Sequence, residues 1–281
     1  MMQDELQAPD VYGRTFQLDQ PTLEVIAARL EARGQHSFFI RAIDDYLARL
    51  ALTGRERVLD FGCGTGLVAR TLAKRAGFTG EIAAIDISDG LIAMGRRYAT
   101  AEGIADRVSF HSGDAHRSNL PEGGFDVIIA HTLISHVADP AAVLLEARRL
   151  LQPKGRIVVF DGDYASFTFT TDDPDHGKAM DEALAGSLVA QPRVMRIMPR
   201  LLDAAGLSLI DAYPSIVADI GRADFFAAAL ASFRVLLPKA GLLNVEQTNN
   251  YIDGLEKASA ERRFFGASNF YTYIARRPQK T

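Results

Sequence analysis

Cysteine is almost absent from this sequence, because Cys63 is the only one among 281 residues. A single thiol excludes an intrachain disulfide framework and fits the reducing cytoplasm. A basic excess is also missing, since 31 Lys and Arg stand against 35 Asp and Glu, so nucleic acid finds no general electrostatic footprint. No apolar run approaches the ~20 residues of a bilayer span, and the acidic start MMQDELQAPD is unlike a secretory signal. We therefore expect a cytoplasmic protein with neither nucleic-acid nor membrane partners.

The first fifty residues contain two helical patterns. In residues 21–33, apolar side chains recur at helical spacing between Pro21 and Gly34, and a second such pattern covers 36–50. We therefore expect a helical N-terminal segment over residues 1–52, followed by the main domain over residues 53–281.

From residue 57 to about 163, short apolar runs alternate with helix-length segments, for example RVLDFG, LVARTLAKRA and EIAAIDI. Runs that are apolar on both faces and joined by helices predict an α/β fold with a parallel sheet covered on both sides. Ser88 and Asp139 stand where helix N-caps are expected, with Pro140 at the first helical position. Beyond residue 164 the pattern indicates a helix, a strand, two more helices and a final strand, FYTYIARR.

The stretch RVLDFGCGTGLVAR places Gly62, Gly64 and Gly66 at every second position directly after an apolar run. A strand, a glycine turn and a helix can offer backbone N–H groups to a nucleotide-like ligand. Asp86 lies 20 residues after Gly66 and can accept hydrogen bonds from ribose hydroxyls; the alternative is a structural acid next to a helix N-cap. The spacing is not the Gly-x-Gly-x-x-Gly of dinucleotide sites, and the acidic Asp60 would repel a pyrophosphate but suit a ligand with an amino group.

Four motifs resemble those of the class I S-adenosylmethionine-dependent methyltransferases over roughly residues 55–165. VLDFGCGTG resembles the first motif, AIDIS the second with Asp86 as its acid, and HSGDAHRSNLP the third, in which Asp114 would meet the adenine amino group. FDVIIAHTLISHV and LLEARRLLQPKGRIVVFD are similar to the fourth strand, helix and fifth strand of the small-molecule branch, which includes quinone-biosynthesis C-methyltransferases. The resemblance implies S-adenosyl-L-methionine as cofactor, bound by Asp60, Gly62, Gly64, Gly66, Asp86, Ile87, Asp114, Ala115 and His131.

The resemblance also implies a Rossmann-like fold. Its seven-stranded, mostly parallel sheet would have the last strand, FYTYIARR, antiparallel at the edge. The family builds its substrate lid from the N-terminal helices and from an insertion before the last strand, here at about residues 219–265. Both segments are expected to move over the sheet edge.

Side chains that take part in methyl transfer should follow the carboxyl ends of the strands. His131 and His136 follow the fourth strand and are the catalytic candidates, with structural hydrogen bonding as the alternative for each. Asp161 and Asp163 follow the fifth strand, but without a further acid or histidine cluster we expect no metal site. Tyr12 is a candidate to close over the cofactor.

The methyl acceptor is narrowed by elimination. HTLIS after the fourth strand lacks the Asn/Asp-Pro-Pro-aromatic motif of DNA-base amino methyltransferases, and the lone Cys63 argues against cytosine C5 and arsenite chemistry. A small organic molecule remains as the acceptor. Aromatic residues of the expected lid are suited to bind it unless they simply pack in the core: Phe225, Phe226, Phe233, Phe264 and Phe265.

Two other functions are alternatives to methyl transfer. One is an enzyme that uses the bound cofactor for a non-methylating reaction, and the other is a non-catalytic cofactor- or metabolite-binding module. A nicotinamide oxidoreductase fails on the loop spacing. We expect a monomer or homodimer.

Overall fold

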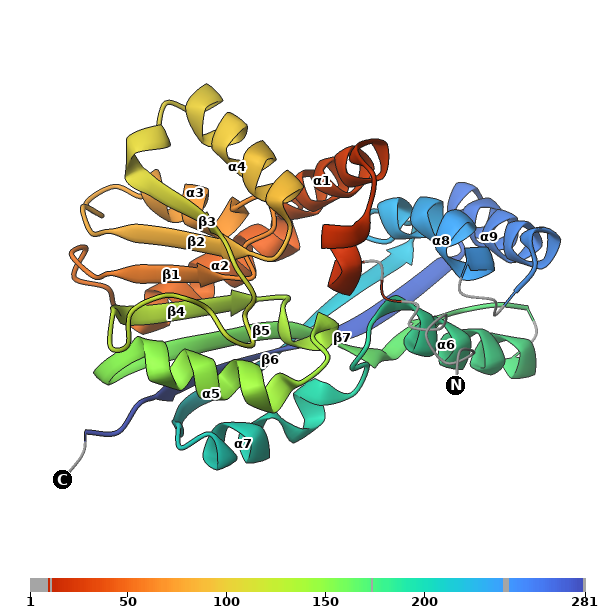
Figure 1. The fold of residues 1–281 in the computed structure, drawn as a ribbon. Coiled ribbons are helices and arrows are strands. Elements are labelled where there is room, and N and C mark those ends of the chain that lie inside the picture. Colours follow the sequence, from red (N-terminus) through yellow and green to blue (C-terminus); the bar gives the residue numbers. More distant parts are fainter. Residues whose placement is uncertain (1–9, 11, 173, 240–242, 280–281) are drawn as a thin grey trace, which may run out of the picture.

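A single mixed sheet organises the chain in the computed structural model, which describes residues 10, 12–172, 174–239 and 243–279 (Figure 1). Its strand order is β3-β2-β1-β4-β5-β7-β6. The strands are β1 (Val58–Phe61), β2 (Ile82–Asp86), β3 (Val108–Ser112), β4 (Phe125–His131), β5 (Leu151–Phe169), β6 (Ser208–Gly221) and β7 (Phe264–Arg276). Neighbouring strands from β3 to β5 are parallel, whereas β7 is antiparallel to both β5 and β6. The expected seven-stranded α/β fold with an antiparallel last strand is confirmed.

The position of the last strand differs from the expectation. β7 inserts between β5 and β6, so β6 and not β7 forms that edge of the sheet. The inner position explains why the side chains of β7 alternate between buried and half-buried along nearly its whole length. A strand that is paired on both sides buries more of its surface than an edge strand, and β6 is mostly exposed.

Side chains of alternate strand residues point to opposite faces of the sheet and pack in two hydrophobic cores, one on each side. Val58 and Phe160 pack with the helices on one face, while Leu59 and Val159 pack with α5 and α7 on the other. The helices are α1 (Gln20–Gln35), α2 (Ser37–Leu50), α3 (Leu67–Ala73), α4 (Asp89–Ala101), α5 (Pro140–Leu150), α6 (Pro174–Leu188), α7 (Val194–Ala204), α8 (Ala227–Lys239) and α9 (Val245–Ala260). Short 3₁₀ turns are η1 (Tyr12–Gln17), η2 (Ala105–Arg107) and η3 (Ile134–His136).

The N-terminal helices are found where the sequence predicted them. One face of α2 is buried, with Tyr46 and Leu50 at 0% exposure, and it packs against the sheet. α1 lies instead on α4, through a small cluster that includes Leu23 and Met94. Residues 1–9 of the expected N-terminal segment lie outside the described residues.

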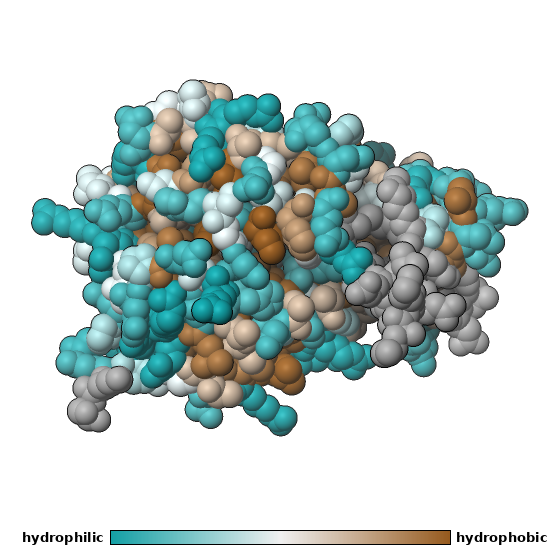
Figure 2. Space-filling model, viewed as in Figure 1, coloured by the Kyte–Doolittle hydropathy of each residue, from teal (hydrophilic) through white to brown (hydrophobic). Residues whose placement is uncertain are grey.

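The C-terminal half contains a helical group, α6, α8 and α9, which lies beyond the ends of the strands, on the right in Figure 1. α8 and α9 lie between β6 and β7, as expected for the insertion at about 219–265. α6 was not predicted, and neither was the extension of β5 to Phe169. On the face in Figure 2, hydrophobic residues form small separate patches among hydrophilic ones. Within the described ranges, no helix has both the length and the apolarity that a bilayer crossing requires.

Candidate active site

A cavity of about 790 Å³ opens at the carboxyl ends of β1, β2 and β4. Its walls include the glycine loop after β1, the end of β2, the segment after β3, both candidate histidines and residues of η1 and α1. All of the sequence-predicted cofactor residues except Gly66 line this one cavity. Parallel strands bring their carboxyl ends to the same edge, which is why residues far apart in sequence meet here.

The glycine loop adopts a backbone that L side chains rarely allow. Gly62, Gly64 and Gly66 have φ of 71°, 55° and 75°. Space adds a second constraint, because a Cβ on Gly62 would collide with Leu133 and one on Gly66 with the ring of Phe110. Glycine is therefore required in this loop by conformation and by packing.

The N–H groups of the loop are largely engaged within the protein. Those of Gly62 and Cys63 both donate to the carbonyl of Ile85 at 2.9 Å, and that of Gly64 donates to Asp86. A pyrophosphate needs free amide donors and tolerates no nearby carboxylate. The geometry thus supports the conclusion drawn from the spacing, that the loop is unsuited to a nicotinamide dinucleotide.

Asp86 ends β2 and holds the loop in place. One carboxylate oxygen accepts from Gly64 N–H at 2.7 Å and the other from Ser88 N–H at 2.9 Å. Each carboxylate oxygen has a second lone pair, so the side chain can still accept two ribose hydroxyls. Burial raises the pKa of Asp86, although the two N–H groups act in the opposite direction. Its fit to a ribose and its role in fixing the loop are compatible.

Asp60 is buried beneath the loop, with 2% of its surface exposed. One oxygen accepts from the N–H of Ala69 at 3.0 Å, in the first turn of α3, and thereby caps a helix whose own N-cap residue, Gly66, has no side chain. Burial raises the pKa of Asp60 to about 7, against the effect of the Ala69 N–H, and the neighbouring Asp86 adds to the increase. A cationic ligand group would stabilise the charged form.

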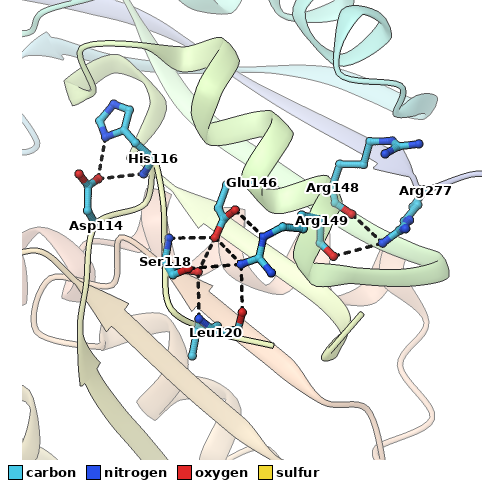
Figure 3. Close-up of polar contacts among 8 residues, drawn as sticks. All are labelled: Asp114, His116, Ser118, Leu120, Glu146, Arg148, Arg149 and Arg277. Carbon is cyan, nitrogen blue, oxygen red and sulfur yellow. Dashed lines mark hydrogen bonds and ion pairs between the residues drawn. The ribbon is translucent and has the colours of Figure 1, made fainter. Parts of the chain in front are cut away.

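The third motif contributes Asp114 and Ala115 to the cavity wall. Asp114 accepts from the backbone N–H of His116 at 2.8 Å and lies 2.6 Å from its ring Nδ1 (Figure 3). Burial alone would raise the pKa of Asp114, but the His116 contacts outweigh it and lower the pKa. The side chain is 48% exposed, so it keeps lone pairs that can accept from an amino group.

The segment after Asp114 is anchored on α5 (Figure 3). The N–H and hydroxyl of Ser118 both donate to Glu146, at 2.8 and 2.6 Å. Arg149 pairs with Glu146 and also donates to the carbonyl of Leu120. This network fixes the third motif relative to the fourth strand and its helix.

Apolar side chains complete the part of the cavity next to Asp86. Ile87, at 39% exposure, joins Leu91, Leu133 and Val137 in the wall. An exposed isoleucine between an acid and an apolar wall is suited to a flat aromatic base beside a ribose. The residues therefore fit an adenosine group that carries a cationic chain.

His131 lies at the end of β4 and contacts aromatic residues. Its Nδ1 is 3.2 Å from the hydroxyl of Tyr46, and its ring centroid lies 4.8 Å from that of Phe160. Burial, with a smaller contribution from the positive charge of Arg33, lowers the pKa of His131 to about 3. The ring is neutral at physiological pH and is a weak base.

His136 lies in η3 and forms a pair that the sequence did not predict. Its Nδ1 is 3.0 and 2.9 Å from the two oxygens of Asp10. The ring of Tyr12 lies 5.2 Å from that of His136, and both residues line the cavity. Tyr12 therefore lies over the site as expected, whereas Asp10 gave no motif signal because it is 126 positions away from its partner.

Arg33 is a second residue that sequence reasoning missed. Its guanidinium donates to Thr132 Oγ1 at 2.8 Å and lies 4.8 Å from the ring centre of Phe39. No carboxylate in the described part of the chain lies within ion-pair distance of it. An amphipathic helix normally carries surface arginines, so nothing distinguished this one before folding.

Asp161 and Asp163 lie within β5 and not after it as expected, because this strand extends to Phe169, and both side chains are buried. Asp161 accepts from the N–H and hydroxyl of Ser135, and Asp163 pairs with Arg196 at 2.8 Å. Among the residues that the structure describes, no group of three His, Cys, Asp or Glu is placed to hold a metal.

The aromatic residues proposed for the lid lie outside the described cavity wall. Phe226, Phe233 and Phe264 are buried at 2% exposure or less, and Phe225 stacks on Phe39 at 5.8 Å. This burial matches the alternative that these aromatic residues pack in the core. The contact between Phe225 and Phe39 connects the insertion to α2.

Comparisons with known proteins identify the family. A family profile described as "Methyltransferase domain" matches residues 52–198. The methyltransferase GfsG of Streptomyces halstedii is 31% identical over 211 residues, which cover 74% of this chain and 72% of that protein. The ubiquinone/menaquinone biosynthesis C-methyltransferase UbiE of Roseobacter denitrificans is 33% identical over 128 residues, 46% of this chain and 50% of that protein.

A solved structure shows the same fold. Phosphoethanolamine N-methyltransferase 2 of Haemonchus contortus, in complex with S-adenosyl-L-methionine, superposes with a TM-score of 0.59 at 17% identity, over 97% of this chain and 60% of that one. The profile match covers more than half of the chain, and the alignment with GfsG covers 74% of it. The protein therefore belongs to the class I S-adenosylmethionine-dependent methyltransferases.

Proposed function

We propose that this methyltransferase acts on a small organic acceptor that enters the same cavity as its cofactor. The observation that carries the proposal is the shared cavity, which is lined by the glycine loop and Asp86 as well as by His131 and His136. At about 790 Å³ it lies in the size range of small-molecule sites.

S-adenosylmethionine, when bound, supplies a methyl group activated on a sulfonium. The carboxylate of Asp86 would hold the ribose, and Asp114 and Ala115 the adenine, with Ile87 against the base. Asp60 and the loop Gly62–Gly66 would lie beneath the amino-acid portion. The chain's own contribution is then to orient the acceptor toward that methyl group and to exclude water.

The moving lid is also a proposal. α1 contacts the loop directly, since the hydroxyl of Thr65 donates to Glu31 at 2.6 Å and the buried Arg70 pairs with Glu31 at 2.5 Å. η1 forms the outer part of the wall. The residues of the expected N-terminal segment that line the cavity are Asp10, residues 12–17, Leu30, Arg33, Gly34 and Phe39. Ala190, after α6, lines it as well. We also propose a cytoplasmic location and a monomeric or homodimeric state.

The test is to incubate the protein with S-adenosylmethionine and a fractionated metabolite pool. We expect release of S-adenosylhomocysteine and a product 14 mass units heavier than its acceptor, on the methylene mass difference. An enzyme with a non-methylating reaction would change the metabolite without this release. A binding module would change neither.

A further inference from the structure

His131 and His136 engage their Nδ1 atoms in opposite ways. Nδ1 of His136 faces both oxygens of Asp10, at 3.0 and 2.9 Å, and a carboxylate can only accept. Nδ1 of His136 therefore carries the proton. In the neutral ring Nε2 then has the lone pair, and no donor in the described ranges lies within hydrogen-bond distance of it.

His131 has the reverse arrangement. The hydroxyl of Tyr46 is fully buried, and Nδ1 of His131 at 3.2 Å is its hydrogen-bond partner among the described residues. Burial raises the pKa of Tyr46 well above its usual value, so the phenol keeps its proton and donates it to Nδ1. The proton of the neutral His131 ring is then on Nε2, which makes this ring a donor to the cavity and unsuitable as a base.

The carboxylate that contacts His136, that of Asp10, is held in place by backbone hydrogen bonds. It is 3% exposed and accepts from the backbone N–H groups of Tyr12 at 2.9 Å, Gly13 at 3.1 Å and Ala190 at 3.1 Å. Three separate segments, before α1, after β4 and after α6, thus meet at one carboxylate. The rings of Tyr12 and Tyr164 flank His136 at 5.2 and 6.1 Å and restrict its rotation.

We infer that His136 is the general base that removes the proton of an acceptor hydroxyl, with Asp10 as the positioning residue that keeps Nε2 free. This inference rests on the proposed function. The O–H bond breaks and its proton goes to Nε2. The oxygen electron pair forms the bond to the methyl carbon, while the pair of the carbon–sulfur bond stays on sulfur. The imidazolium, stabilised by Asp10, then returns its proton to solvent.

A hydroxyl is the acceptor class that most needs such a base. An amine attacks through its own lone pair and loses a proton afterwards, and a thiol with a pKa near 8.5 ionises readily in water. A phenol, with a pKa near 10, or an alcohol stays protonated at neutral pH. General-base assistance contributes about 10²–10⁴ in rate for such groups.

The deciding experiment measures histidine tautomers by ¹⁵N NMR on the full chain saturated with S-adenosylhomocysteine. We expect Nδ1–H with bare Nε2 for His136 and the opposite form for His131. Asp10→Asn should keep the His136 form, because the amide oxygen still accepts from Nδ1–H, and Asp10→Ala should produce a tautomer mixture. His111→Gln is the matched control, since His111 is exposed on β3 outside the cavity wall. A bare Nδ1 and protonated Nε2 in His136 would overturn the inference.

A second readout uses phenol, aniline and thiophenol as matched acceptors at millimolar concentration. We expect phenol turnover that falls at least about a hundredfold in His136→Gln, with unchanged affinity for S-adenosylhomocysteine. Equal phenol turnover in wild type and His136→Gln would overturn the inference. If none of the three is methylated, the tautomer result decides alone. Failure to bind S-adenosylhomocysteine at all would instead contradict the proposed function.

Discussion

The Asp86 carboxylate accepts a hydrogen bond of 2.7 Å from the backbone N–H of Gly64. The acid that ends β2 and the glycine loop that follows β1 are thereby one structural unit. A side chain that was predicted from its distance along the sequence to bind ribose thus also fixes the loop that lies beside the ligand.

Asp86→Asn should weaken the binding of S-adenosylhomocysteine at least about tenfold. The amide removes the charge and turns a donor toward the N–H of Gly64 or Ser88, and hydrogen bonds to charged groups contribute about 1.5–3 kcal/mol, where ~1.4 kcal/mol is one decade. Calorimetric titration measures the change. Asp89→Asn is the control, because Asp89 contacts Ser112 and does not line the cavity. Unchanged affinity in Asp86→Asn would remove the ribose assignment.

Gly66→Ala should destabilise the fold more than Gly103→Ala does. Both glycines have positive φ, 75° and 71°, so both alanines meet the same backbone strain of about 1–2 kcal/mol. Only the Cβ at residue 66 meets the Phe110 ring, whereas residue 103 has open space; overpacking adds about 1–3 kcal/mol. Urea unfolding of the two variants gives the difference, and equal losses would show that strain alone matters.

Asp60→Asn should change how stability depends on pH. The pKa of Asp60 is about 7 in the folded protein, against the ordinary aspartate value of 3.8 that it regains when the chain unfolds. Between these values the unfolded chain has lost the proton that the folded chain retains, so this group makes stability fall as pH rises, by up to about 1.4 kcal/mol per pH unit. The variant lacks this contribution.

The measurement is the free energy of unfolding of the cofactor-free protein at pH 5, 6, 7 and 8. We expect the difference between Asp60→Asn and wild type to shift in favour of the variant as pH rises to about 7, and then to level off. A difference that is constant with pH would mean that Asp60 is already ionised in the folded state at pH 5.

Arg33→Gln should weaken the binding of S-adenosylhomocysteine about tenfold. It should not weaken the binding of decarboxylated S-adenosylhomocysteine, which lacks the carboxylate of the amino-acid portion. A half-buried guanidinium that bonds only to Thr132 in the described structure can still pair with an anion in the cavity. Arg29→Gln, one turn earlier on α1 and outside the cavity wall, is the control. An equal loss for both ligands would indicate a structural role for Arg33.

Binding of S-adenosylhomocysteine should slow amide hydrogen exchange in η1 and α1. These elements line the cavity and α1 contacts the glycine loop through Thr65 and Glu31, and segments that close over ligands are drawn from the less stable parts of a fold. Mass-spectrometric exchange with and without the ligand measures this. Protection confined to residues 57–115 would contradict a lid.

The sequence alone predicted most of the elements, together with a set of cofactor residues that, apart from Gly66, line one cavity. Apolar runs, N-caps at Ser88 and Asp139, and the spacing from the glycine loop to Asp86 are local signals, because helix caps and turn conformations depend on neighbouring residues. Features that depend on contacts between distant segments leave no such local signal, and these are the features that the sequence did not predict. α6 packs mainly on β5, and the far end of β5 pairs with β7, so both depend on contacts between segments distant in sequence. β7 likewise lies between β5 and β6 because of pairing between distant strands.

Only the tertiary structure distinguishes the surroundings of the two candidate histidines. Asp10 and His136 are 126 positions apart, and Tyr46 and His131 are 85 apart, so no sequence pattern links either pair. Burial lowers the pKa of His131, and a carboxylate fixes the proton of His136. Both effects depend on what surrounds an imidazole in space, because desolvation and hydrogen bonding act over a few ångströms whatever the distance along the chain.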